Sequence, residues 1–230
     1  KTPKYVGDPI NAVRIFNEKE VDELVFLDLD ASREQREPNM RLIEDLATEC
    51  FMPFAYGGGI RSIDQIKRIL SIGVEKVVLN HYILNNTAFI RQAADHFGSS
   101  TIIAGIDVKK DLWGNYRVYN HVLKKVTSED ALSYARKVET AGAGEIFLNN
   151  VDRDGTYAGL DLQLISQVNR SISVPLIVCG GASSLGDIKS AITQTNISAV
   201  AAGSLFVYQG PHRAVLISYP QKKEIENLFS

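Results

Sequence analysis

The sequence predicts an α/β fold built on a parallel β-sheet. Short apolar runs alternate along the chain with longer amphipathic segments. Strands that are apolar throughout indicate a sheet that is covered by helices on both faces. We expect seven strands, at residues 23–28, 53–56, 76–79, 101–107, 145–150, 175–179 and 199–202. Helical periodicity is clearest over residues 63–72, 86–96, 128–141 and 162–172.

An internal repeat narrows this class to a barrel. Segment 53–67 recurs in outline as segment 175–189, and segment 22–28 aligns with 144–150, so both pairs are offset by 122 residues. In the second copy a strand that ends at Asp107 precedes the matched block, and its counterpart would lie before the first residue. Seven strands leave two unpaired edges, whereas a closed barrel leaves none. We therefore expect a (β/α)8 TIM barrel of two repeated half-barrels, whose first strand is missing from the 230 residues.

Length and composition fit a single barrel domain over residues 1–230, N-terminally incomplete. The chain is 45% hydrophobic and has a net charge of −2, which provides no basic field for nucleic acid or an anionic membrane. Its apolar runs are too short to span a bilayer. Neither Cys50 and Cys179 nor the four histidines have metal-ligand spacing, so we expect no metal and no other cofactor. The cysteine usage predicts a reducing compartment, and we expect the cytoplasm.

Glycine-rich turns follow a strand in each half of the chain, at residues 57–59 and 180–181. Glycine lets an anion approach backbone N–H groups closely, so such turns can bind phosphate. Each turn alone is explained equally well as a simple connection from strand to helix. Because the repeat relates the two turns, they predict two phosphate sites and a substrate that carries a phosphate at each end.

Carboxylates also follow several of the predicted strands: Asp28, Asp30, Asp107, Asp152 and Asp154. Such groups are costly to desolvate unless they are used or paired. Asp107 ends an otherwise apolar strand and is our candidate for the general acid or base. The alternative is a carboxylate that only accepts hydrogen bonds from nearby loop amides. Asp154 precedes Gly155 and Thr156, and this segment can cap a helix or present N–H groups to a phosphate.

Together these residues resemble the HisF family, the cyclase subunit of imidazole glycerol phosphate synthase. The likeness runs from about Gly7 to Phe206 with almost the same spacing. It is carried by residues 7–9, 22–28, 57–60, 107, 142–145, 152–156 and 180–182. The resemblance implies a lyase and cyclase of histidine biosynthesis, paired as a heterodimer with a HisH-type glutaminase at the N-terminal face of the barrel. Ammonia from that glutaminase would cross the barrel core to a bis-phosphorylated ribulosyl substrate.

The resemblance also implies roles for individual residues. Asp107 corresponds to one of two catalytic aspartates, and Gly59 and Asn80 correspond to one phosphate site. The second phosphate site would comprise Asp154, Gly155, Gly181, Gly203 and Ser204. The ammonia gate at the base of the barrel would comprise Glu23, Lys76 and Glu145, although a salt-bridge cluster that seals the barrel explains the same three residues. The second aspartate and a fourth gate residue belong to the first strand.

Several positions depart from the family pattern. Asn149 and Asn150 replace small hydroxyl residues, His81 replaces Thr or Ser, and residues 121–123 replace a glycine-containing turn. With segments 4–11 and 208–220, these features look like HisF paralogues of surface-polysaccharide clusters that supply nitrogen to acetamidino sugars. Three hypotheses stay open: the cyclase, an ammonia-conducting partner for lipopolysaccharide biosynthesis, and a sugar-phosphate isomerase of the related HisA type.

Overall fold

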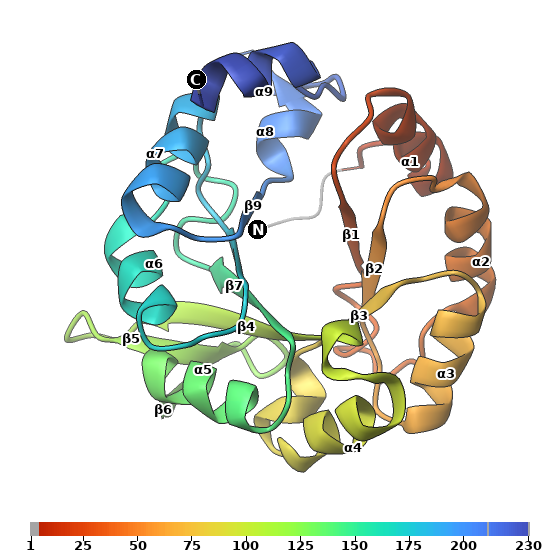
Figure 1. Ribbon diagram of the computed structural model, residues 1–230, viewed down its shortest axis with the longest axis vertical. Helices are drawn as coiled ribbons and strands as arrows, with labels where there is room; N and C mark the ends of the chain where they lie inside the picture. Colours follow the sequence, from red (N-terminus) through yellow and green to blue (C-terminus); the bar gives the residue numbers. More distant parts are fainter. Residues whose placement is uncertain (1–4, 211, 230) are drawn as a thin grey trace.

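Seven parallel strands form the core of the fold. The computed structural model describes residues 5–210 and 212–229. Neighbouring strands hydrogen-bond in the order β1 (Leu24–Leu27), β2 (Phe54–Gly57), β3 (Lys76–Leu79), β4 (Ile102–Lys110), β7 (Glu145–Asn150), β8 (Leu176–Cys179) and β9 (Ala199–Ala201). Figure 1 shows this sheet curled into a barrel with the helices on its outer side. The predicted α/β barrel and its seven strands are therefore confirmed.

The sheet remains open between β1 and β9. Within residues 5–210 and 212–229, neither strand pairs with a further strand on its outer side. Near this opening lie α8 (Ser204–Val207), α9 (Lys222–Phe229) and a hairpin of β10 (Tyr208–Gln209) and β11 (Ala214–Val215). The hydroxyl of Tyr219 donates a hydrogen bond to Asp22 Oδ2 at 2.7 Å. The C-terminal segment thus connects the β9 side of the opening to the start of β1.

Seven helices pack around the sheet: α1 (Pro9–Glu18), α2 (Met40–Glu49), α3 (Ile63–Ser71), α4 (Ala88–Phe97), α5 (Ala131–Thr140), α6 (Leu162–Asn169) and α7 (Leu185–Thr195). Side-chain caps determine where several of them begin. Ser62 accepts a hydrogen bond from the N–H of Gln65, and Ser184 accepts one from the N–H of Asp187. Asp8 caps α1 in the same way, with Pro9 in the first helical position.

The segment between β4 and α5 differs from the prediction. β5 (Tyr116–Asn120) pairs antiparallel with β4, and β6 (Lys125–Asp130) pairs antiparallel with β5. The predicted helix start at residue 128 is therefore wrong, because Asp130 caps α5 and the residues before it belong to β6. β6 is polar and partly exposed, so it lacks the apolar pattern by which the other strands were recognised.

Side chains inside the barrel form three levels. Alternate residues of a strand point to the same face of a sheet. The middle level is a cluster of apolar side chains, namely Ala55, Val78, Ile103, Phe147 and Ile177. Two residues earlier, Lys76 and Glu145 occupy the level at the strand starts, and two residues later, Asn80 and Asn149 occupy the level at the strand ends. A much larger apolar cluster packs between the outer face of the sheet and the helices.

Candidate functional site

Asp107 lies at the centre of the polar level at the strand ends. Its Oδ2 accepts a hydrogen bond from Asn80 Nδ2 at 3.0 Å, and its Oδ1 accepts one from Asn149 Nδ2 at 2.8 Å. The Asp107 side chain is 14% exposed. A carboxylate can only accept hydrogen bonds, so Asp107 requires both amides to present their nitrogen atoms. Two amides held by neighbouring strands therefore orient a largely buried carboxylate at the mouth of the barrel.

Two histidines adjoin this carboxylate. His121 Nδ1 lies 3.3 Å from Asp107 Oδ2, in contact but without the alignment of a hydrogen bond. The ring of His81 meets that of His121 edge to face, with 5.9 Å between centroids. Burial, and then the proximity of His121, lower the pKa of His81. His81 is therefore neutral at pH 7.

Several polar atoms around Asp107 have no partner among the described residues, although they are buried. They are Asn80 Oδ1, Asn149 Oδ1, and the Nδ1 atoms of His81 and His121. Buried polar atoms in proteins are nearly always hydrogen-bonded, to protein, water or ligand. Four such atoms around one carboxylate indicate a place where a polar molecule binds.

A hollow opens at the same end of the barrel as Asp107. Its lining includes Asp154, Gly155, Gly181, Gly203 and Ser204. These five residues are the ones predicted to form the second phosphate site, and the fold brings them together from three separate loops. Cys179 also lines the hollow. Burial, and then the nearby carboxylates of Asp154 and Asp107, raise the pKa of the Cys179 thiol to about 12, so it is neutral at pH 7.

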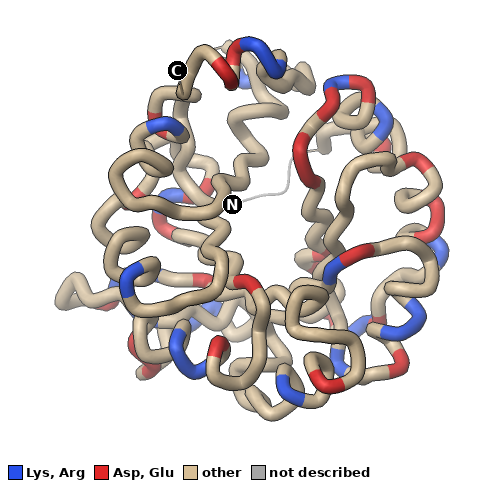
Figure 2. Tube along the Cα trace, viewed as in Figure 1, with Lys and Arg blue, Asp and Glu red and all other residues tan. Residues whose placement is uncertain are grey.

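The strand starts carry a charged cluster at the opposite end of the barrel. Lys76 Nζ donates to Glu145 Oε1 at 2.6 Å, and Glu23 directly precedes β1. Burial opposes a charge on Lys76, but the hydrogen bond to Glu145 and the negative charges of Glu145 and Glu23 outweigh it and raise the pKa of Lys76. Figure 2 shows charged residues around the central opening as well as over the outer helices. The three predicted gate residues therefore interact.

Comparison with known proteins identifies the family. Residues 1–212 match the family described as histidine biosynthesis protein. The chain belongs to the HisF family. It is 50% identical over 226 residues (98% of this chain and 90% of the relative) to a Pseudomonas aeruginosa protein provisionally named imidazole glycerol phosphate synthase subunit hisF2. A Vibrio vulnificus protein, provisionally named subunit hisF3 of the same synthase, is 46% identical, with 97% of this chain and 86% of the relative covered. The imidazole glycerol phosphate synthase subunit HisF of Alkaliphilus metalliredigens is 37% identical, with 89% and 81% covered.

The two residues of the first predicted phosphate site, Gly59 and Asn80, follow the neighbouring strands β2 and β3 of this HisF-family chain. A Cβ atom on Gly59 would approach the carbonyl oxygen of Arg36 to 2.6 Å, so Gly59 packs against the loop that follows β1. The Asn80 amide instead donates to Asp107. These contacts of the described residues do not link Gly59 to Asn80, so the first phosphate site stays a prediction.

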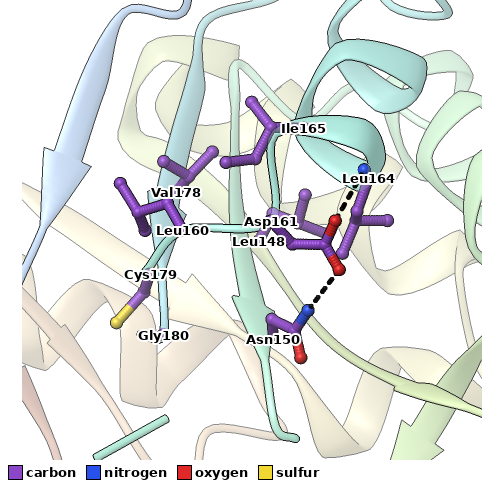
Figure 3. Close-up of a pocket in the computed structure, with 9 residues that line it drawn as sticks. All are labelled: Leu148, Asn150, Leu160, Asp161, Leu164, Ile165, Val178, Cys179 and Gly180. Atoms are coloured by element: carbon purple, nitrogen blue, oxygen red, sulfur yellow. Dashed lines mark hydrogen bonds between the residues drawn. The ribbon is translucent and has the colours of Figure 1, made fainter. Parts of the chain in front are cut away.

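The two asparagines that replace family hydroxyl residues point to different places. Asn149 donates to Asp107, whereas Asn150 Nδ2 donates to Asp161 Oδ2 at 3.1 Å. Figure 3 shows Asn150 and Asp161 facing each other beside α6, with Asp161 also accepting from the N–H of Leu164. Asn150 and Asp161 thus anchor the loop between β7 and α6. The place of Asp161 directly before the helical pattern is a capping signal that marks it from sequence.

Sequence reasoning missed two residues beside the hollow, Tyr157 and Arg213. The Tyr157 hydroxyl donates to the carbonyl oxygen of Ser204 at 2.8 Å. The guanidinium of Arg213, in the β10–β11 hairpin, lies 4.9 Å from the centre of the Tyr157 ring. No local pattern relates residues so far apart in the chain.

Among the helices of the described residues, none combines the length and apolarity needed to cross a membrane.

Proposed function

We propose that this chain is the ammonia-using synthase subunit of a glutamine amidotransferase pair, with lyase and cyclase activity of the imidazole glycerol phosphate synthase type. The observation that carries the proposal is Asp107, held at the barrel mouth beside a hollow lined by glycines, in a chain 50% identical to a protein named as a subunit of that synthase. Active sites of such barrels lie at the carboxyl ends of the strands. Asp107 and the hollow both lie there.

The hollow supplies the proposed binding site for one substrate phosphate. Gly203 has no atom within 4 Å of an added Cβ, so space remains beside its backbone. The N–H of Asp154 is already bonded to the carbonyl oxygen of Asn150, at 2.9 Å. We therefore assign phosphate contacts to Gly155, Gly181, Gly203 and Ser204 rather than to the Asp154 amide. Arg213 lies close enough to offset the repulsion between Asp154 and a phosphate.

The charged cluster at the strand starts supplies the proposed entrance for ammonia. Glu23, Lys76 and Glu145 lie below the apolar middle level, and Asp107 lies above it. A small neutral molecule such as ammonia can pass an apolar layer that excludes ions. We propose that a HisH-type glutaminase docks on this face and that the cluster opens to admit ammonia.

The glutaminase pairing is tested by measuring glutamine hydrolysis with and without this protein. A specific complex is expected to bury roughly 1,200–2,000 Å² in total and to raise hydrolysis. A combined Glu23→Ala and Lys76→Ala change is expected to keep that hydrolysis but uncouple it from nitrogen transfer, because ammonia leaks to water. An absence of both complex and stimulation contradicts the pairing.

The cyclase activity is tested by supplying the protein with ammonium salt and the ribulosyl substrate. Turnover is expected without the glutaminase, and Asp107→Asn is expected to lower it by roughly 10²–10⁴-fold, because an amide cannot exchange protons as a carboxyl group does. Asp45→Asn, in exposed α2, is the matched control and keeps full activity. Each relative reported above carries the synthase name, so the comparisons favour this reaction over isomerase chemistry or acetamidino-sugar synthesis.

A further inference from the structure

His121 is placed to do more than fill space beside Asp107. Both Asp107 oxygens already accept a hydrogen bond from an asparagine amide. Both carboxylate oxygens are therefore engaged by amide N–H groups. Imidazole, in contrast, exchanges protons near neutral pH. The imidazole of His121, in contact with Asp107, is thus suited to a second proton transfer at this site.

The geometry around His121 fits an oriented base. Its Nδ1 is the atom next to Asp107, at 3.3 Å, and the ring remains 19% exposed. No hydrogen bond to a described residue uses its Nε2 atom, and Nε2 is not among the buried unpartnered atoms. A carboxylate next to Nδ1 favours the proton on that nitrogen and leaves the Nε2 lone pair available. Asp107 from β4 and His81 after β3 are the titratable groups in contact with the ring.

We propose that His121 is a second proton-transfer residue of this site, with Nδ1 beside the Asp107 carboxylate and Nε2 presented to the substrate. The proposal rests on the proposed function. In the forward step a proton leaves a substrate O–H or N–H group and joins the Nε2 lone pair, and the resulting imidazolium is paired with the Asp107 carboxylate. The same proton then returns to the oxygen or nitrogen atom that leaves, so His121 is restored. Neutral His81 packs against the ring without competing for this proton.

The deciding variant is His121→Asn, assayed in the full-length protein with ammonium salt and the ribulosyl substrate. An asparagine amide can occupy the Nδ1 position beside Asp107, but it has no Nε2 base. We expect kcat to fall at least about 100-fold with KM changed less than about threefold. His96→Asn, on exposed α4, is the matched control and is expected to stay within about twofold of the parent. More than a tenth of the parent kcat in His121→Asn shows that His121 only holds Asp107, which overturns the proposal.

A second measurement works without turnover and therefore separates the two hypotheses. The ¹⁵N shifts of the His121 ring report which nitrogen carries the proton. We expect the Nδ1–H form in the parent protein and its loss in Asp107→Asn. If the parent shows no turnover, the proposed function is wrong, and the ¹⁵N shifts alone test the contact between His121 and Asp107. The same shifts test that contact if the His121→Asn protein fails to fold. An Nε2–H ring in the parent, or a ring unaffected by Asp107→Asn, overturns the proposal.

Discussion

The two halves of the barrel contain the same glycine turn followed by a serine-capped helix, but the residues around the two turns differ. Gly59 and Gly181 occupy equivalent positions of the repeat, and Ser62 and Ser184 cap the helices that follow them. In both halves a side chain one turn into the helix bonds back to the loop: Gln65 accepts from the Arg61 N–H, and Asp187 accepts from the Ser183 N–H. The turn itself is therefore conserved between the halves by local hydrogen bonding.

The difference lies one strand later. Gly203 in the second half corresponds to His81 in the first, at the same offset of the repeat. Gly203 leaves open space and lines the hollow, whereas the imidazole of His81 fills its position and packs against His121. The equivalent positions thus differ in one side chain, which is absent in the second half and packs against His121 in the first.

The largest effect on stability is expected from two matched substitutions, Gly181→Val and Gly59→Val. Both glycines have positive φ, +106° and +70°, and a Cβ would come within 2.4 Å and 2.6 Å of a carbonyl oxygen. Each valine is expected to lower the free energy of unfolding by about 3 kcal/mol or more, measured by urea denaturation. If Gly59→Val loses little stability while Gly181→Val loses much, the two turns are not packed equivalently.

Gly203→His gives the second half the side chain that His81 provides at the equivalent position of the first half. Gly203 has φ −101°, which any residue adopts, and nothing lies within 4 Å of its added Cβ. We expect the Kd for inorganic phosphate, measured by calorimetry, to rise at least about tenfold while the melting temperature changes little. Ser71→His, at an exposed position of α3, is the control. Unchanged phosphate binding places the anion site elsewhere.

A smaller effect is expected from Arg213→Ala, which removes the cation next to Gly155 and Tyr157. The side chain is exposed, so solvent screens its charge. Its removal is expected to weaken phosphate binding by about two- to fivefold, and raised salt should narrow the difference. Lys222→Ala in α9 is the control with the same loss of charge. Equal effects of the two substitutions contradict a local role.

The smallest effect concerns the acid sensitivity of the first half. The pKa of His81 is lowered from its ordinary value of 6.5 in the folded protein. As pH falls below 6.5, the unfolded chain binds a proton that folded His81 resists, so stability decreases. In His81→Asn, the free energy of unfolding should therefore fall less between pH 7 and pH 5 than it falls in the parent protein. Chemical denaturation at both pH values checks the difference.

Sequence patterns predicted the strands of the barrel well, because each is a short apolar run between capped helices. Those at Lys76–Leu79 and Glu145–Asn150 match residue for residue. They missed β5, in which buried Tyr116 and Val118 alternate with less buried residues, and they missed β6, whose polar residues carry little hydrophobic signal. At the site, Asp107 and the five residues of the hollow were selected from sequence, but Arg213, Tyr157 and the contact between His121 and Asp107 were not.

The sequence by itself determined the α/β class, the repeat and the end of each strand at which polar residues gather, because these follow from periodicity and from short-range capping. Only the tertiary structure decided which polar residues meet. Asn149 faces Asp107 while its neighbour Asn150 faces Asp161, since successive side chains of a strand point to opposite sides. His121 reaches Asp107 because a hairpin folds back along β4, and that contact depends on strand pairing rather than on any local pattern.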